Sequence, residues 1–224
     1  MVIHTQNLSW HWPHRGGSLH FPDIRLTQGE HLFIRGPSGS GKSTLLSLLS
    51  GLNQATEGNI EVHGQDLKRL GGGARDRLRA DSTGVIFQQF NLVPYLSALD
   101  NVLLPCRLSA TRRRRAGAIQ AAARHLLQAL DLPADSLGRK PAALSIGQQQ
   151  RVAAARALIG APPLILADEP TSALDTHNRD RFVNLLLERA ADHGTSVVLV
   201  SHDPSLAVHF THHLELTIGR EDAP

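Results

Sequence analysis

The sequence is poor in cysteine and in aromatic residues. It has 224 residues with one cysteine, Cys106, and phenylalanine, tryptophan and tyrosine together make up 4% of it. A single cysteine excludes an intrachain disulfide, which is typical of proteins that fold in a reducing compartment. No run of about 18 apolar residues occurs, so we expect no membrane-spanning helix. The first residues also lack the charged start and apolar stretch of a secretory signal peptide, and we expect none.

Neither sign of charge dominates the sequence. Lysine and arginine number 23 and aspartate and glutamate 20, which gives a formal net charge of +3 and an isoelectric point of about 9.6. Except at 112–115 the basic residues are scattered, so the basic stripe typical of nucleic-acid-binding proteins is missing and we expect no such partner. The 13 histidines are not accompanied by cysteine pairs, which favours ordinary surface and core positions over a structural metal site.

One stretch, Gly-Pro-Ser-Gly-Ser-Gly-Lys-Ser at 36–43, fits G-x-x-x-x-G-K-[ST], the phosphate-binding P-loop. An apolar run at 31–34 precedes it, and leucines on one helical face follow it, which is the strand–loop–helix context that the motif requires. Its glycines allow backbone angles that a Cβ would forbid, so successive N–H groups can point at one phosphate. The predicted phosphate ligands are Gly36, Pro37, Ser38, Gly39, Ser40, Gly41, Lys42, Ser43 and Thr44, with the Ser43 hydroxyl also suited to Mg²⁺.

A second motif is an apolar run at 164–167 that ends in two carboxylates, Asp168 and Glu169. The end of a strand beside a P-loop is where a Mg²⁺ ligand is expected. Asp168 is therefore a candidate Mg²⁺ ligand and Glu169 a candidate general base for an attacking water. The alternative is a solvated acidic turn without function.

Strands and helices alternate on either side of a helical stretch. Strands are predicted at 60–62, 85–87, 164–167, 197–200 and 214–218, helices at 112–130, 145–160 and 178–191, and a flexible loop at the glycines 71–73. The alternation predicts an α/β fold with a parallel sheet, in two blocks around a helical insert of about residues 90–160.

Residues 144–151, Leu-Ser-Ile-Gly-Gln-Gln-Gln-Arg, contain an S-x-x-Q capping box formed by Ser145 and Gln148. The stretch is either a helix cap alone or an anion site at a helix N-terminus. It resembles the signature sequence of ATP-binding-cassette (ABC) ATPases, usually Leu-Ser-Gly-Gly-Gln. Ile146 replaces the first signature glycine, so its backbone must take an angle that side chains tolerate.

The other motifs of that family occur in order. Trp12 resembles the aromatic residue that stacks on adenine, with Trp10 the less favoured candidate. Gln88 resembles the Q-loop glutamine, and residues 172–175, which end in Asp175, resemble the D-loop. His202 resembles the switch histidine. This resemblance covers essentially the whole chain.

The resemblance implies a P-loop NTPase (RecA-like) core with an antiparallel β subdomain and an inserted α-helical subdomain. The chain would be a single domain, with 1–89 and 161–224 forming the nucleotide-binding core and 90–160 the helical subdomain. It also implies a homodimer that encloses two ATP molecules, with Mg²⁺ bound by Ser43, Gln88 and Asp168. In that dimer Ser145, Gly147 and Gln148 contact the ATP of the partner chain, Glu169 and His202 are catalytic, and Asp175 links the two sites.

In this family the helical insert meets a transmembrane permease on the cytoplasmic side of the bacterial inner membrane. The apolar residues after Gln88 line a groove for that partner or pack the insert's own core, and Tyr95 and Leu96 are the favoured contacts. The run at 112–115 faces lipid head groups or, as such runs more often do, forms a solvated helix face.

The compact length and residues 95–102 and 148–152 resemble the bacterial branch of lipoprotein-release and macrolide-export ATPases. This implies export or extraction of a lipoprotein, lipid or drug. Two alternatives remain open at this point. One is a cassette that powers a membrane machine such as the cell-division complex, and the other is a soluble cassette that acts on nucleic acid, which usually has two cassettes or a coiled coil in one chain.

Overall fold

The computed structural model describes residues 1–12, 15–172 and 174–217, apart from the side chains of residues 12, 15 and 16. Its centre is a parallel sheet with the strand order β10 (His212–Glu215), β4 (His31–Arg35), β9 (Ser196–Ser201), β8 (Leu164–Asp168) and β7 (Thr83–Ile86). Every residue of β9 is buried, which explains why the central strands of such a sheet have uninterrupted apolar sequences. The predicted parallel sheet is therefore confirmed.

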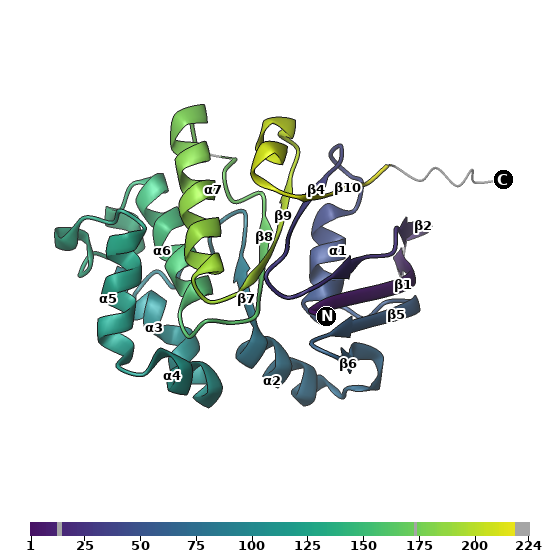
Figure 1. Cartoon of the computed structure of the whole chain (residues 1–224), viewed down its shortest axis with the longest axis horizontal. Helices are drawn as coiled ribbons and strands as arrows, with labels where there is room; N and C mark the ends of the chain where they lie inside the picture. Colours follow the sequence, from purple (N-terminus) through teal and green to yellow (C-terminus); the bar gives the residue numbers. More distant parts are fainter. Residues whose placement is uncertain (13–14, 173, 218–224) are drawn as a thin grey trace.

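Helices cover both faces of this sheet, and they include α1 (Lys42–Leu49), α6 (Ile146–Leu158) and α7 (Thr176–Ala191). Side chains alternate between the two faces along each strand. Leu166 and Val198 belong to one hydrophobic core with the leucines of α1, whereas Ala167 and Leu199 belong to a second core with residues of α6 and α7. Figure 1 shows the sheet between α1 on one side and α6 and α7 on the other.

A second, antiparallel sheet packs on the α1 side. Its strands follow the order β2 (Arg15–Phe21), β1 (Ile3–Trp12), β5 (Glu57–Val62) and β6 (Gln65–Asp66), and β3 (Arg25–Leu26) also pairs with β1. Ile3 pairs with Val62 across β1 and β5, and both are buried in the core shared with α1. This sheet lies at the opposite end of the molecule from the helices that follow β7 (Figure 1).

Helices dominate the chain between β7 and β8. They are α3 (Ala98–Leu108), α4 (Ala110–Ala116), α5 (Ile119–Ala129) and α6, with single 3₁₀ turns at Ala134–Ser136 and Pro141–Ala143. Further 3₁₀ turns lie at Leu67–Arg69 and Pro204–His209. Among the described residues, no helix has both the length and the apolar character needed to cross a bilayer.

The prediction of one helix over 112–130 is wrong, because the chain breaks between α4 and α5. Gly117 ends α4 with φ of 63°, a left-handed angle that glycine adopts without steric cost. The amphipathic pattern predicted for the second part is correct, since Ala123, Leu127 and Leu130 are buried.

The prediction of a flexible loop at 71–73 is also wrong. Gly71 is the N-cap of a further helix, α2 (Gly72–Ser82), and its φ of −68° is an ordinary angle. None of the residues of α2 is fully buried, so the helix has no apolar stripe that its sequence could reveal.

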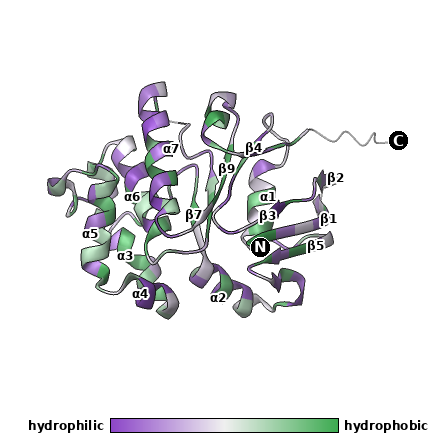
Figure 2. Ribbon diagram, viewed as in Figure 1, coloured by the Kyte–Doolittle hydropathy of each residue, from purple (hydrophilic) through white to green (hydrophobic). Residues whose placement is uncertain are grey.

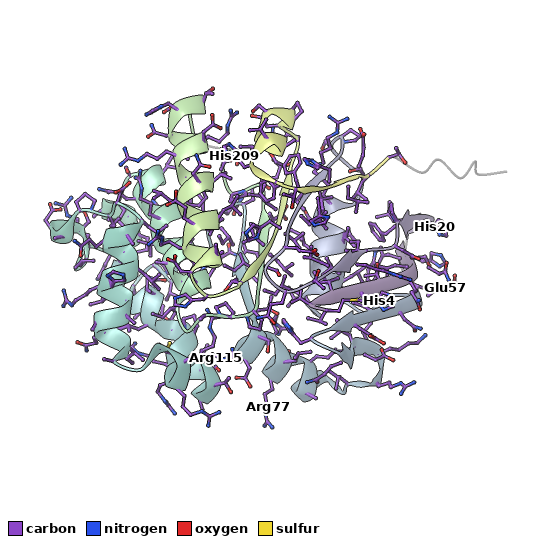
Figure 3. The ribbon with its side chains drawn as sticks, in the orientation of Figure 1. His4, His20, Glu57, Arg77, Arg115 and His209 are labelled. Carbon is purple, nitrogen blue, oxygen red and sulfur yellow. The ribbon has the colours of Figure 1, made fainter. Side chains whose placement is uncertain are left out.

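The run of arginines on α4 is not a uniform solvated face. Figure 2 shows this helix among the more hydrophilic parts of the molecule, but the side chain of Arg112 is only 3% exposed. Its guanidinium donates to the carbonyl oxygens of Ile159 (2.6 and 2.8 Å) and Ala157 (2.5 Å) at the end of α6. Arg115 is exposed at the surface (Figure 3) and donates to the carbonyl oxygen of Asp81 in α2 (3.2 Å). Arg112 thus caps α6 and connects it to α4.

Candidate functional site

The P-loop runs from the end of β4 to the start of α1. A Cβ on Gly36 would lie 2.5 Å from Ser40 Oγ and 2.6 Å from the backbone oxygen of Leu216, so no side chain fits there. Gly41, the N-cap of α1, has φ of 88°, and a Cβ on it would lie 2.6 Å from the Leu19 side chain. Gly36 is therefore required for steric reasons, whereas Gly41 is also required for its left-handed backbone angle.

The loop borders a cavity of about 570 Å³. The cavity lies where β4 and β8 end, at the carboxyl edge of the parallel sheet, which is the usual ligand-binding edge of such folds. It is lined by Ser38, Gly39, Gly41, Lys42, Ser43, Thr44, Gln88, Glu169 and His202. The structure thus brings together residues predicted from the P-loop, the Q-loop, the carboxylate motif and the switch histidine.

Lys42 is held at the base of this cavity. Its side chain is only 7% exposed, and Nζ donates to the carbonyl oxygens of Gly36 (2.8 Å) and Pro37 (2.9 Å). The same Nζ lies 3.8 Å from Glu169 Oε1. An ammonium fixed in this way can contact an anion in the cavity without having to be ordered first.

Glu169 and His202 form a close pair that also borders the cavity. His202 Nδ1 lies 2.6 Å from Glu169 Oε2, while the Glu169 side chain is 15% exposed and that of His202 is 64% exposed. Glu169 has φ of 43°, a left-handed angle that costs a residue with a side chain about 1–2 kcal/mol. Its N–H donates to the carbonyl oxygen of Val200 (2.9 Å), which helps to hold the backbone there. Such strain is common where a side chain must be aimed at a ligand.

Asp168 lies next to this pair at the end of β8. Burial raises the pKa of its carboxyl group, the hydroxyl of Ser43 lowers it by donating a hydrogen bond, and the nearby carboxylate of Glu169 raises it further. Ser43 and Gln88 line the cavity, and Asp168 adjoins it through its hydrogen bond with Ser43. Their hydroxyl, amide and carboxylate oxygens are hard donors of the kind that Mg²⁺ prefers. The chemistry of these residues therefore fits a Mg²⁺ ion.

The signature residues lie elsewhere. Ser145 caps α6 in the predicted capping box: its Oγ accepts from Gln148 N (3.2 Å), and Gln148 Oε1 accepts from Ser145 N (2.9 Å). Ser145 and Gly147 border a separate hollow of about 220 Å³, together with Leu174 next to Asp175. Asp175 in turn caps α7, and the hydrogen bonds it accepts from Asn178 lower the pKa of its carboxyl group. Within one chain, these residues do not join the phosphate cavity.

Ile146 is the first residue of α6 and its backbone takes no left-handed angle, as expected for a position that carries a side chain. That side chain is 54% exposed.

Other predicted residues do not face the cavity directly. Ser40 is buried beneath the loop, and Pro37 contributes a carbonyl to Lys42. Trp10 packs against the core of the antiparallel sheet. The side chain of Trp12 and residue 173 of the D-loop lie outside the described part of the chain.

Sequence reasoning missed two contributors to the site. Leu19 lies against the P-loop at Gly41, and Arg156 of α6 binds the chain just beyond Gln88. The sequence gives no local signal for either contact, because the partners are at least 20 residues apart.

Comparison with known proteins identifies the family. The family model described as "ABC transporter" matches residues 19–172. The lipoprotein-releasing system ATP-binding protein LolD of Anaeromyxobacter dehalogenans is 44% identical over 202 residues, which cover 90% of this chain and 83% of that protein. The macrolide export ATP-binding/permease protein MacB 1/2 of Paracoccus denitrificans is 42% identical over 198 residues, which cover 88% of this chain and 29% of that longer protein.

Solved structures agree. The ATP-binding cassette MJ0796, solved as a dimer in a post-hydrolysis state bound to ADP and Pi, superimposes with a TM-score of 0.83 at 34% identity, covering 98% of this chain and 97% of that chain. The predicted P-loop NTPase fold and the predicted branch of lipoprotein-release and macrolide-export proteins are both confirmed. The chain therefore belongs to the ABC transporter family and is the subunit that binds and hydrolyses ATP.

Proposed function

We propose that two copies of this chain enclose two ATP molecules and hydrolyse them to drive a membrane permease. The observation that carries the proposal is the separation of two half-sites on one chain. The phosphate cavity contains the P-loop, Glu169 and His202, whereas Ser145 and Gly147 border another hollow. A second copy, packed head to tail, would bring the signature residues of each chain to the ATP of the other. The relative MJ0796 was solved as a dimer bound to ADP and Pi, which supports a dimer of this chain.

The phosphates of ATP would bind to N–H groups within residues 38–44 and to Nζ of Lys42, while Trp12 stacks on adenine. From the partner chain, Gly147, Gln148 and Ser145 would approach the γ-phosphate. The cap bond uses Ser145 Oγ as an acceptor, so its hydroxyl hydrogen can still donate to a phosphate oxygen. Asp175 would connect the two sites of the dimer.

Hydrolysis would depend on Glu169. Its carboxylate would accept a proton from the attacking water, and His202, 2.6 Å from Oε2, would orient that carboxylate and face the γ-phosphate. Ser43, Gln88 and Asp168 would hold Mg²⁺ together with phosphate oxygens. When bound, Mg²⁺ neutralises charge on the phosphates.

The permease would dock on the helical side. A groove of about 370 Å³ lies between α2, β7 and the helices α3 and α6, and two exposed leucines border it, Leu52 (53% exposed) and Leu108 (79%). Tyr95 is 73% exposed and so is also accessible to a partner, whereas Leu96 is half-buried. Apolar side chains in and around a groove suit a docked partner helix.

By analogy with LolD and MacB, the work done would be export or extraction of a lipoprotein, lipid or drug. The protein would then sit on the cytoplasmic face of the bacterial inner membrane, held there by its permease. We further propose that residues 1–89 with 161–224 act as the nucleotide-binding core and that residues 90–160 act as the helical subdomain.

Dimerisation can be tested with the Glu169→Gln variant, which is designed to retain ATP. With Mg²⁺ and ATP, light scattering after gel filtration should give about twice the 24.3 kDa of one chain. A single-chain mass at saturating ATP would contradict the proposed dimer.

The permease can be sought with the same variant, purified with ATP from native membranes in mild detergent. Co-purification of a permease with few spans and a large periplasmic domain supports the export or extraction role. A division-complex protein would assign the chain to a membrane machine instead, and recovery of only a soluble partner would contradict the transporter role.

A further inference from the structure

The segment that carries Gln88 leaves the phosphate cavity by an unusual path. β7 ends at Ile86, Gln88 lines the cavity, and the chain then passes through Phe90 and Asn91 with φ of 58° and 47°. Two consecutive left-handed residues with side chains are disfavoured by contacts between Cβ and the backbone. The path therefore needs other interactions to hold it.

Arg156 of α6 supplies such interactions. Its Nη2 donates to the carbonyl oxygen of Phe90 (2.5 Å) and its Nη1 donates to that of Asn91 (2.7 Å). The left-handed angles let two successive carbonyls meet the two arms of one planar guanidinium, and a lysine ammonium could not match both in the same way. Burial lowers the pKa of Arg156, but a guanidinium stays charged at neutral pH.

Neighbouring contacts limit how far the segment can move. Phe90 is 8% exposed and packs in the hydrophobic core that includes residues of α6 and α7. Further on, the side chain of Asn101 in α3 accepts from Val93 N (2.8 Å) and donates to Val93 O (3.1 Å). The chain beyond Gln88 is thus attached at residues 90–91 to α6 and at residue 93 to α3.

Arg156 also borders the groove described above. Arg156 and Asn91 line it together with Leu52 and Leu108. The same side chain therefore contacts the groove and, through two carbonyls, the segment that carries Gln88. Helix α6 lies beside β7, so the connection is short (Figure 1).

We propose that Arg156 is a positioning residue that holds Gln88 in the phosphate cavity. The proposal rests on the proposed role of Gln88 as a Mg²⁺ ligand. Arg156 touches neither ATP nor Mg²⁺ in this account and acts through the backbone of residues 90–91.

The test compares Arg156→Lys with Arg124→Lys, an exposed arginine on α5. The first readout is hydrogen exchange in the nucleotide-free protein. Amides of residues 88–93 should exchange about tenfold faster in Arg156→Lys, while amides of β8 and β9 keep their rates. The second readout is the Mg²⁺ concentration that half-saturates binding of a fluorescent ATP analogue, which should rise about fivefold. Arg124→Lys should change neither.

A double variant separates this proposal from the role of Gln88. If Arg156 acts through Gln88, then Gln88→Ala raises the half-saturating Mg²⁺ concentration, and adding Arg156→Lys to it raises that concentration no further. Should Gln88→Ala shift the concentration while Arg156→Lys does not, the positioning role is overturned and the Gln88 role stands. No shift in Gln88→Ala would overturn both. Faster hydrogen exchange throughout residues 90–160, with no change in the half-saturating Mg²⁺ concentration, would show a purely structural role for Arg156 and overturn the proposal.

Discussion

Replacing Arg112 with methionine tests how α4 is attached to the rest of the molecule. Methionine is close to arginine in length and apolar, so it can fill much of the same space without donating hydrogen bonds. The substitution removes the charged donor from the carbonyls of Ala157 and Ile159 at the buried end of α6. It also removes the weaker contact to the Thr83 carbonyl (3.5 Å).

The expected cost follows from these contacts. A hydrogen bond from a charged group contributes about 1.5–3 kcal/mol. The substitution removes the short hydrogen bonds to the carbonyl oxygens of Ala157 and Ile159. Removing a buried guanidinium offsets part of this, because burial is costly enough to lower the pKa of Arg112 to about 10. We therefore expect a net destabilisation of about 3 kcal/mol, or a fall of about 6–12 °C in the thermal midpoint for a domain of this size.

The assay is thermal unfolding of the nucleotide-free protein, followed by circular dichroism. Arg113→Met is the matched control, since Arg113 is on the same helix and exposed, and it should change the midpoint by less than about 2 °C. The thermal midpoint of Arg112→Lys should lie between those of Arg112→Met and Arg113→Met. One ammonium can donate to only some of the carbonyl oxygens that the guanidinium contacts. If Arg112→Met unfolds at the temperature of Arg113→Met, the capping role assigned to Arg112 is wrong.

Two other predictions concern the site. Burial raises the pKa of Asp168, so the folded protein binds a proton at this carboxylate more tightly than the unfolded chain does. The ionised carboxylate therefore destabilises the nucleotide-free fold at high pH, and this penalty fades as the pH falls through that pKa. Asp168→Asn should therefore raise the thermal midpoint at about pH 8, raise it less at about pH 5, and lower ATPase activity; equal gains at both pH values would contradict the burial effect. Gly36→Ala places a Cβ 2.6 Å from the Leu216 carbonyl and should weaken ATP binding, measured by calorimetry, at least about tenfold. Gly71→Ala, in open space, should leave ATP binding unchanged, and equal affinities in the two variants would count against a constrained P-loop.

The central strands could be predicted because each is buried on both faces. Their apolar runs at 31–34, 164–167 and 197–200 lie within β4, β8 and β9. Once the P-loop and the carboxylates are placed at strand ends, their meeting at one edge of a parallel sheet follows from topology. This is why the sequence predicted most residues of the cavity.

Other features depend on contacts between distant segments. Helix α2 has no buried residue and so no periodic apolar pattern, and its first residues are glycines. Four arginines in a row look alike in sequence, and only the carbonyls at the end of α6, about 45 residues away, make Arg112 the buried one. The contact of Arg156 with Phe90 likewise joins residues 66 apart. Local pattern contains no information about such pairs.

The central claim, that this cavity hydrolyses ATP with Glu169 as the base, is tested most directly by Glu169→Gln. The control is Glu188→Gln, which changes an exposed glutamate on α7. Steady-state ATPase activity and ATP affinity would be measured on both variants. We expect Glu169→Gln to bind ATP with near-normal affinity and to hydrolyse it about 10²–10⁴-fold more slowly, the usual contribution of a general base, with Glu188→Gln unchanged. Turnover in Glu169→Gln within a few-fold of the unsubstituted protein would contradict the account.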